Sequence, residues 1–374
     1  MIHQGIREKL EAKEESLSPF ATRSRLSAGR LRPEEPCPMR TAFQQDRDRI
    51  IHCKAFRRLK HKTQVFIAPL GDHFVTRLTH TLEVAQIARS IARALNLNED
   101  ITEAVALGHD LGHPPFGHVG EETLNTLYRP GFDHSNQSLR VVDFLERDGQ
   151  GLNLTREVRE GILHHSKERM GILEETNSPS GTLEGQICKL ADAVAYINHD
   201  TTDALRANLL TEADLPPVVT SVLGKSSSER INTLITDIVD SSWAASGSIS
   251  GEEKPQIRLS PPVLEAANCF RDFLFERVYK LSSTQPIAEE AREVVRLLYD
   301  YYLQYPDKIL LNPPIKQAYI QRNEPVERQV LDYIAGMTDL FAFRLAAEIT
   351  PFKCHLQNRL SDHLHGDPLW INGK

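Results

Sequence analysis

Apolar residues recur at spacings of three and four along most of the chain, which is the period of an α-helix with one buried face. The clearest case is residues 73–95, whose apolar positions are Leu78, Leu82, Ala85, Ala88, Ile91, Ala92 and Leu95. Val84 and Ile87 form a second stripe, so we expect this helix in the core. Further helical patterns cover Ile101–Leu111, Glu184–Arg206 and the region from about Leu264. Strand-like alternation is scarce, and the sequence predicts an all-α protein.

The segment Leu17–Arg40 lacks this periodicity and is rich in Pro, Arg, Ser and Gly. We expect an irregular arm that becomes ordered against the body or against another subunit. Charge is uneven here, because Thr22–Lys62 holds twelve Lys or Arg against four Asp or Glu, whereas the whole chain carries a net charge of -7. That total excludes a uniformly basic, histone-like binder, but the arm could still contact an anionic partner.

The remaining composition indicates a reduced, soluble protein. The five cysteines are scattered without a CxxC pair, which is typical of free thiols in the cytoplasm. The N-terminus has no apolar run of the kind a secretory signal needs, and no window approaches the roughly 18 apolar residues of a membrane span. We therefore predict a cytoplasmic protein with no membrane contact.

Candidate chemistry begins with three residues that could bind a metal ion, His80, His109 and Asp110. His109 and Asp110 close the run Ile101–Leu111, where Gly112 and two prolines end the helix. Neighbouring helical residues point about 100° apart, so this pair could grip one ion only from a helix end. His80 lies on the Val84/Ile87 side of its helix, where an imidazole is otherwise a poor core residue.

Asp192 is the best candidate for a further acidic ligand. Within Glu184–Arg206, one continuous helical face is polar, formed by Asp192, Tyr196, His199, Asp200 and Asp203. A polar stripe on a core-facing helix is costly unless it lines a site. Two imidazoles and two carboxylates suit a divalent ion, with Mn²⁺ or Mg²⁺ expected first and Fe²⁺ or Ni²⁺ as alternatives. An isolated His-Asp dipeptide is common, so the prediction depends on this conjunction.

These residues resemble the H…HD…D signature of the HD superfamily of phosphohydrolases. Within it, the chain resembles the bacterial deoxyguanosine triphosphate triphosphohydrolase-like proteins, a similarity that spans roughly Leu17–Ala347. The motifs that carry it are DRDRII (46–51), FRRLKHKTQVF (56–66), HDLGHPPFGHVGE (109–121), FDHSNQSLR (132–140), REGILHHS (159–166), ADAVAYINHD (191–200) and AGMTD (335–339).

The resemblance implies a reaction in which a deoxynucleoside triphosphate (dNTP) yields a deoxynucleoside and inorganic triphosphate. It assigns His118 as the proton donor to the leaving 5′ oxygen, with Glu121 orienting that imidazole. His113 would touch phosphate, and Arg77 would clamp the triphosphate. A surface salt bridge is the alternative for Arg77.

By the same resemblance, Gln64 and Asp200 would bind the 3′-hydroxyl, and Tyr196 would stack against the sugar at C2′. Simple core packing is the alternative for Tyr196. Between the adjacent His164 and His165, we favour His165 as the one that faces the site. We expect four other histidines to be structural or exposed, namely His52, His61, His73 and His134.

The resemblance divides the chain into an N-terminal helix and basic arm (1–50), an HD phosphohydrolase core (51–210) and a C-terminal helical region packed on it (211–374). It also leads us to expect a homo-oligomer. Two other functions stay open. One is another HD phosphohydrolase, such as a nucleotidase or phosphodiesterase. The other is binding of single-stranded nucleic acid by the basic stretch 22–62, with four candidate side chains, Arg47, Arg49, Arg57 and Arg58.

Overall fold

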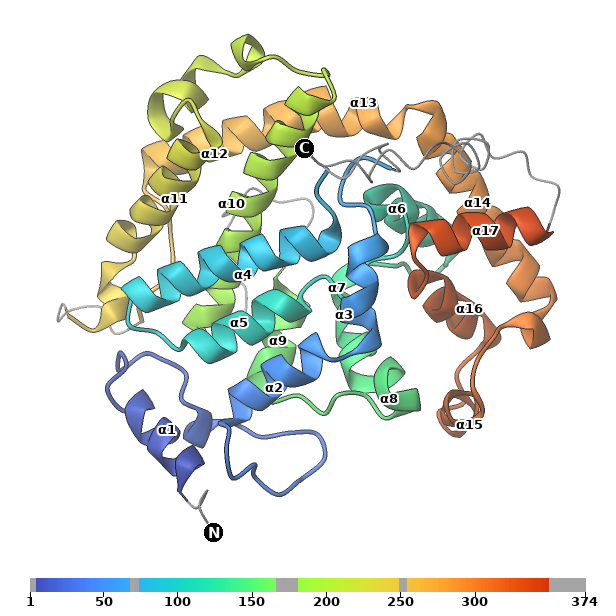
Figure 1. The fold of residues 1–374 in the computed structure, drawn as a ribbon, viewed down its shortest axis with the longest axis horizontal. Coiled ribbons are helices and arrows are strands. Elements are labelled where there is room, and N and C mark those ends of the chain that lie inside the picture. Colours follow the sequence, from blue (N-terminus) through green and yellow to red (C-terminus); the bar gives the residue numbers. More distant parts are fainter. Residues whose placement is uncertain (1–4, 68–73, 166–180, 249–253, 350–374) are drawn as a thin grey trace, which may run out of the picture.

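The computed structural model describes residues 5–67, 74–165, 181–248 and 254–349, and within them the protein is helical (Figure 1). The first nine helices are α1 (Ile6–Glu14), α2 (Ala42–Ile51), α3 (Lys54–Arg58), α4 (Arg77–Ala94), α5 (Glu99–Gly108), α6 (Gly117–Leu127), α7 (His134–Arg140), α8 (Glu146–Gly149) and α9 (Arg156–His164). The later ones are α10 (Leu183–Arg206), α11 (Ser227–Ser241), α12 (Pro261–Leu274), α13 (Lys280–Ser283), α14 (Pro286–Gln304), α15 (Pro313–Gln321), α16 (Val326–Ala335) and α17 (Asp339–Ile349). The described residues hold only two isolated β-bridges, so the all-α prediction is confirmed.

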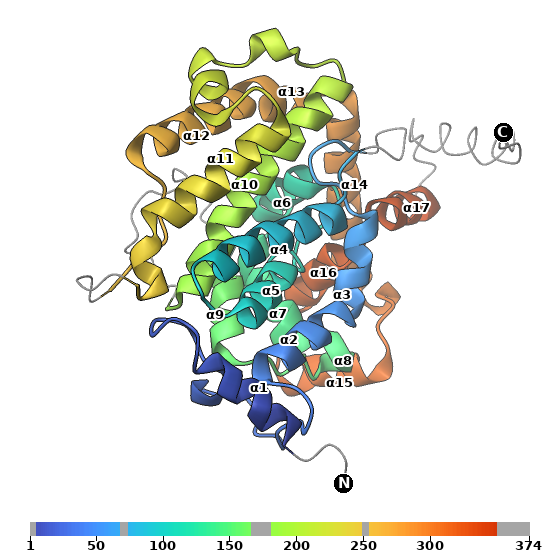
Figure 2. The ribbon, with the colours of Figure 1, turned by 60° about the vertical axis from the view of Figure 1, so that its left-hand side comes forward.

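Helices α4, α5 and α10 pack against one another at the centre of the molecule (Figures 1 and 2). Local signals explain where they begin. Thr76 caps α4 by accepting from the backbone N–H of Thr79, and Thr182 caps α10 in the same way. α5 ends at Gly108, earlier than the predicted Leu111, which leaves His109 and Asp110 at and beyond its C-terminal end.

Two hydrophobic clusters divide the interior. The first joins α2, α4, α5, α9 and α10 to α11 and α12. The second joins α6 and the residues after it to α14, α16 and α17. Helix α6 therefore packs on the C-terminal helices, although it follows α5 directly in the chain.

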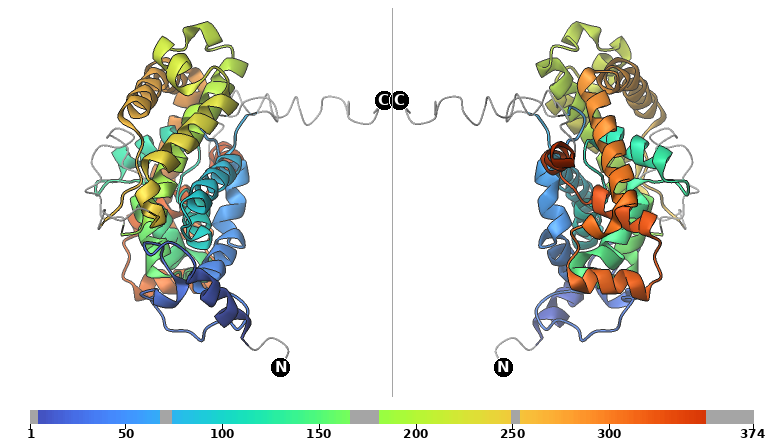
Figure 3. Two further views of the ribbon diagram at one scale, coloured as in Figure 1. Left: turned by 90° about the vertical axis from the view of Figure 1, so that its left-hand side faces the viewer. Right: turned by 90° about the vertical axis from the view of Figure 1, so that its right-hand side faces the viewer.

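The N-terminal arm packs on its own chain. It lies at one end of the molecule (Figure 3), where the hydroxyl of Ser18 donates to the carbonyl of Ala245, just after α11, at 2.6 Å. Thr22 donates to the buried carboxylate of Glu184 from both its backbone N–H and its hydroxyl, at 2.9 and 2.7 Å. Arg30 forms an ion pair with Asp46, which also accepts from the N–H and hydroxyl of Thr155. Of the two expectations for the arm, the described residues support order against the body.

Many cations of the basic stretch are already paired. Arg47 contacts Asp100 and Glu103 at 3.2 and 3.1 Å, and Arg49 contacts Glu34. These pairs reduce the charge that the stretch offers to a nucleic acid.

Two compositional expectations concern thiols and membranes. The four cysteines in the described part of the chain are free thiols, as predicted. Within the same residues, no helix combines the length and the apolar character that a membrane crossing requires.

We expect the Asp46→Ala substitution to lower the free energy of unfolding by about 3–5 kcal/mol, because it removes the more deeply buried of the two carboxylates that pair with Arg30 and leaves Thr155 without its acceptor. The control is Asp48→Ala on the same helix, where the partner Arg40 is half exposed, and there we expect a loss of about 0–1 kcal/mol. Urea denaturation followed by circular dichroism measures both. Equal losses would show that the Arg30–Asp46 pair does not anchor the arm.

Candidate active site

Three helices bring the four predicted metal ligands together. His80 lies in the first turn of α4, Asp192 lies in the middle of α10, and His109 and Asp110 follow α5. His80 Nε2 is 3.1 Å from Asp192 Oδ1, 3.3 Å from His109 Nε2 and 3.7 Å from Asp110 Oδ2. His109 Nε2 is 3.4 Å from Asp110 Oδ1. His80, His109 and Asp110 form one group whose ligand atoms lie within 4.8 Å of one another, and Asp192 forms an adjoining group with His109 and His165. The structure thus gathers residues that are up to 112 positions apart in the chain.

The donor chemistry of this cluster fits a divalent cation. The Nδ1 of His109 donates to the carbonyl of Ala106 at 2.6 Å, so its Nε2 presents a lone pair to the cluster. The Nδ1 of His80 lies 2.8 Å from Nε2 of His199, which leaves Nε2 of His80 to face the same point. Two imidazole nitrogens and two carboxylates at these distances form a ligand set for a metal ion.

The carboxyl groups of Asp110 and Asp192 are ionised, although burial opposes ionisation of each. Burial opposes ionisation of Asp192, but the hydrogen bond from His80 and the nearby His109 bring its pKa down to about 2. Burial likewise opposes ionisation of Asp110, yet His109 and Arg77 hold its pKa well below the usual range. Two negative charges in a largely enclosed cluster favour a bound cation.

The loop after Asp110 is pressed against α7. A Cβ on Gly112 would lie 2.1 Å from the backbone nitrogen of Ser138 and 2.6 Å from the carbonyl oxygen of His134. Only glycine fits such a close approach. Ser138 strengthens the contact, since its hydroxyl donates to the carbonyl of His109 and accepts from the N–H of Gly112. This packing places His113 beside the metal cluster, with Nε2 3.5 Å from Asp110 Oδ1.

Of the expectation that His134 is structural or exposed, exposure is excluded, because this side chain is buried next to His113 and His165. Glu121 accepts from the backbone N–H of His134 at 2.6 Å and lies 2.9 Å from its Nδ1. His134 Nε2 is 3.1 Å from His165 Nε2, and the rings of His134 and His113 stack at 3.9 Å. The favoured choice of His165 over His164 agrees with its burial here. The sequence gives no spacing that links His134 to the HD pair.

The positions of His52 and His61 at the surface match the expectation, and His73 lies outside the described residues.

Four of the residues expected in the site, with roles at phosphate, at the sugar or beside the proton donor, have buried polar atoms that form no hydrogen bond within the described part of the chain. Arg77 is only 1% exposed and donates to Asp110 Oδ2 at 2.7 Å, so it is no surface salt bridge. Its Nε and Nη2 have no partner among the described residues, and neither has Oε1 of the buried Gln64. Nδ1 of His113 and Oε2 of Glu121 likewise have no hydrogen-bond partner among the described residues. Buried polar atoms are rarely left unpaired, so this grouping indicates a ligand site.

His118 lies at the mouth of this site. Its side chain is 61% exposed, its ring centroid is 5.8 Å from that of His113, and its Nδ1 is 3.7 Å from Glu121 Oε2. Glu121 was expected to orient His118, and its shortest contacts are instead with His134. Glu121 therefore contacts the buried His134 most closely, and a small side-chain movement would bring it to the exposed His118.

The polar stripe of α10 continues from Asp192 toward Asp200. Oδ2 of Asp200 accepts from the hydroxyl of Tyr279 at 2.6 Å, and Oδ1 lies 2.8 Å from Nδ1 of His199. Tyr279 closes a π-helical turn, Phe275–Tyr279, in the C-terminal region. Sequence reasoning missed this tyrosine, because only the tertiary fold brings it to α10. Tyr196 packs against the first hydrophobic cluster, and burial raises the pKa of its hydroxyl.

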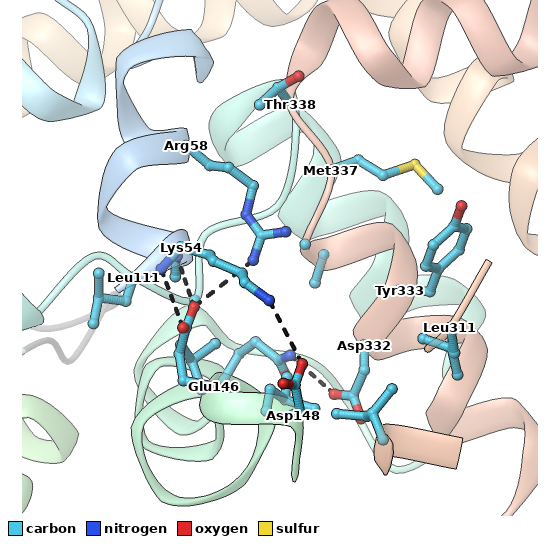
Figure 4. Close-up of a pocket in the computed structure, with 18 of the residues that line it drawn as sticks. Lys54, Arg58, Leu111, Glu146, Asp148, Leu311, Asp332, Tyr333, Met337 and Thr338 are labelled. Carbon is cyan, nitrogen blue, oxygen red and sulfur yellow. Dashed lines mark hydrogen bonds and ion pairs between the residues drawn. The ribbon is translucent and has the colours of Figure 1, made fainter. Parts of the chain in front are cut away.

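A separate cleft of about 630 Å³ lies on the other side of the HD loop, between the core and the C-terminal helices (Figure 4). None of the four candidate metal ligands lines it, although Leu111 and Gly112 do. Its charged groups are largely paired with one another. Glu146 accepts from two backbone N–H groups of α3 and lies 4.0 Å from Arg58, and Lys54 lies 3.5 Å from Asp148. The cleft therefore lies where the core meets the C-terminal helices.

Comparison with known proteins agrees with the fold and the site. The HD domain family model matches residues 77–197, a range that contains all four candidate ligands. A second family model, the phosphohydrolase-associated domain, matches residues 257–348. Together, the helical fold, the His/Asp cluster and these matches define an HD-domain hydrolase.

Among full-length relatives, proteins named deoxyguanosinetriphosphate triphosphohydrolase-like protein are similar over most of the chain. The one from Caldanaerobacter subterraneus subsp. tengcongensis is 52% identical over 92% of this chain and 94% of its own length. The one from Desulfatibacillum aliphaticivorans is 49% identical over 90% and 95%, and that from Clostridium tetani is 44% identical over 88% and 91%. The chain belongs to this deoxyguanosinetriphosphate triphosphohydrolase-like family.

We predict that His109→Ala and Asp110→Asn each abolish stoichiometric metal binding while the helical fold survives. Asparagine is chosen because it keeps an acceptor for the buried Arg77. Elemental analysis of the purified variants, with circular dichroism as the check on folding, measures the effect. A folded variant that retains a full equivalent of metal would remove the substituted residue from the ligand set.

We further predict that His199→Ala weakens metal affinity about 10–100-fold, since His199 orients the ligand His80 through its Nδ1. His52→Ala is the matched control, because His52 is exposed at the end of α2 and should leave affinity unchanged. Titration of the metal-free protein with Mn²⁺ measures both. Equal affinity in the two variants would mean that His199 does not support His80.

Proposed function

We propose that this protein hydrolyses deoxynucleoside triphosphates to deoxynucleosides and inorganic triphosphate at the HD metal site. The carrying observation is that Arg77 and His113, which both contact the candidate ligand Asp110, keep buried nitrogen atoms without a hydrogen-bond partner in the residues that the structure describes. Arg77 offers cationic donors for phosphate, and the unpaired Oε1 of Gln64 is an acceptor for a sugar hydroxyl.

At the phosphate end, Arg77 is the clamp. One of its nitrogens is held by Asp110, which fixes the guanidinium plane, and its Nε and Nη2 donate to the triphosphate. Burial, together with the neighbouring Arg77 and His134, holds the pKa of His113 well below its ordinary value. His113 is therefore a neutral imidazole that binds phosphate through a hydrogen bond and is poorly suited to donate a proton to the leaving group. His80, His109, Asp110 and Asp192 would hold a divalent ion, which would supply Lewis-acid chemistry for the phosphate hydrolysis. Mn²⁺ or Mg²⁺ is our first assignment for this ion.

His118 is the proton donor for the leaving 5′ oxygen. Its exposure at the mouth of the site allows it to be reprotonated from solvent after each turnover. Glu121 holds His134 and, once substrate closes around the mouth, orients His118.

At the sugar end, Asp200 and Gln64 bind the 3′-hydroxyl. The hydroxyl of Tyr279 fixes one oxygen of Asp200, and His199 lies beside the other. Tyr196, one turn before Asp200 on α10, packs against C2′ and leaves no space for a 2′-hydroxyl. This arrangement would favour deoxyribonucleotides over ribonucleotides. A homo-oligomer in the cytoplasm remains our expectation for the working particle.

The direct test is product analysis after incubation with each dNTP and Mn²⁺ or Mg²⁺. We expect equimolar deoxynucleoside and inorganic triphosphate, identified by ³¹P NMR, and little turnover of the matching ribonucleotides. Release of pyrophosphate or monophosphate, or hydrolysis of nucleoside monophosphates alone, would instead indicate another HD phosphohydrolase. Salt-sensitive binding of single-stranded DNA without any dNTP turnover would favour the nucleic-acid-binding alternative.

We predict that His118→Ala retains its metal and its affinity for dNTP but loses about 10²–10⁴-fold in kcat, the usual contribution of acid–base catalysis. The substituted side chain is mostly exposed, so stability should not change. A p-nitrophenyl phosphodiester serves as control substrate, since its leaving group needs no proton and its hydrolysis should be far less impaired. Equal loss of rate on both substrates would show that His118 is not the acid.

A further inference from the structure

The turn that introduces α6 has an unusual backbone. Phe116 adopts the left-handed conformation, with φ 68° and ψ 21°, and Gly117 follows with φ 56°. Phe116 is the only aromatic residue with positive φ in the described part of the chain. A bulky side chain disfavours this conformation, so the surrounding structure must hold it in place. The turn lies between His113 and His118.

Helix α17 supplies two of the contacts that hold the turn. Asp339 Oδ1 accepts from the backbone N–H of Phe116 at 2.9 Å. Asp339 Oδ2 accepts from the backbone N–H of Thr63 at 2.9 Å and from its hydroxyl. The ring of Phe116 is 1% exposed and packs on Phe343, with centroids 4.7 Å apart. One carboxylate and one ring from the same helix therefore fix both the backbone and the side chain of Phe116.

Lys62 makes a parallel connection. Its ammonium group is buried and donates to the carbonyl of Ala335 at 2.9 Å and to the carbonyl of His113. Ala335 is the last residue of α16, and His113 opens the loop that contains the turn. The loop 113–117 is thus bonded directly to Asp339 of α17 at Phe116, and its His113 end is bonded to Lys62, which in turn donates to Ala335 of α16.

These contacts matter because the proposed site draws on both hydrophobic clusters. His109 and Asp110 follow α5, whose apolar face belongs to the first cluster. His118 and Glu121 lie on α6, whose apolar residues Val119 and Leu124 belong to the second. Figure 1 shows α6 beside α14 and α17, away from α5. The distance between the metal cluster and the proton donor therefore depends on how the C-terminal helices hold the turn.

We propose that Asp339 is a positioning residue, which together with Phe343 and Lys62 fixes the first turn of α6 relative to the metal cluster. Asp339 does not touch the candidate ligands or the mouth of the site. Through this role the C-terminal helices contribute to catalysis. The expected change in turnover rests on the proposed function, whereas the expected order of the loop 113–121 does not.

The test is Asp339→Ala, with Tyr299→Phe as the matched control. Tyr299 lies on α14 in the same hydrophobic cluster and donates to Glu327 at 2.8 Å, with no contact to the loop. Hydrogen exchange of the amides of residues 113–121 should be at least about tenfold faster in Asp339→Ala than in wild type, while exchange in α4 and α10 stays unchanged. Mn²⁺ affinity should also stay unchanged. Turnover should fall about 10–100-fold with little change in KM, as expected when a reacting group is misplaced by about an ångström. The control should match wild type in all these measurements.

If Asp339→Ala does not fold, Phe343→Leu takes its place, because it loosens the packing of Phe116 and keeps an apolar side chain. Exchange in 113–121 that matches wild type would overturn the proposal, and so would faster exchange spread evenly over the whole protein. Loss of metal together with turnover would overturn it as well. If the wild-type protein cleaves no dNTP, the proposed function fails, and the exchange and metal measurements alone decide the positioning role.

Discussion

The Nε2 atoms of His80 and His109 each lie within 4.0 Å of both ionised carboxylates, Asp110 and Asp192, and a cation bound among them would offset the repulsion of the two negative charges. The rest of the site follows from this constraint. The carbonyl of Ala106 and the ring of His199 orient the two imidazoles, and Arg77 balances part of the charge on Asp110. The tight packing of α4, α5 and α10 is what keeps like charges together.

The site is also a junction between two parts of the fold. The metal cluster rests on the first hydrophobic core, whereas α6 rests on the C-terminal helices. The HD family model ends at residue 197, before the region that the phosphohydrolase-associated model matches. Lys62, Asp339 and Tyr279 each connect these regions by hydrogen bonds. This arrangement gives a physical reason for an associated helical region beside the HD domain.

The sequence predicted the helices near the site well, because long amphipathic patterns with clear caps report burial directly. It also identified the four candidate ligands, since a polar stripe on a core-facing helix needs an explanation. It placed the end of α5 three residues too late: His109 is the C-terminal cap, with helical backbone angles, and Asp110 lies just beyond it. Tyr279 was missed because it reaches α10 through tertiary packing alone, and His134 was missed although it lies in the recognised motif FDHSNQSLR, because only the tertiary fold brings it to Glu121. The contacts of Asp339 could not be predicted for the same reason, although its motif was recognised.

The most direct measurement is anomalous X-ray scattering at the manganese edge from crystals grown with Mn²⁺. Our account predicts one strong peak within bonding distance of His80 Nε2, His109 Nε2 and the carboxylates of Asp110 and Asp192. A peak elsewhere, with these four side chains in the same positions and no metal between them, would contradict it.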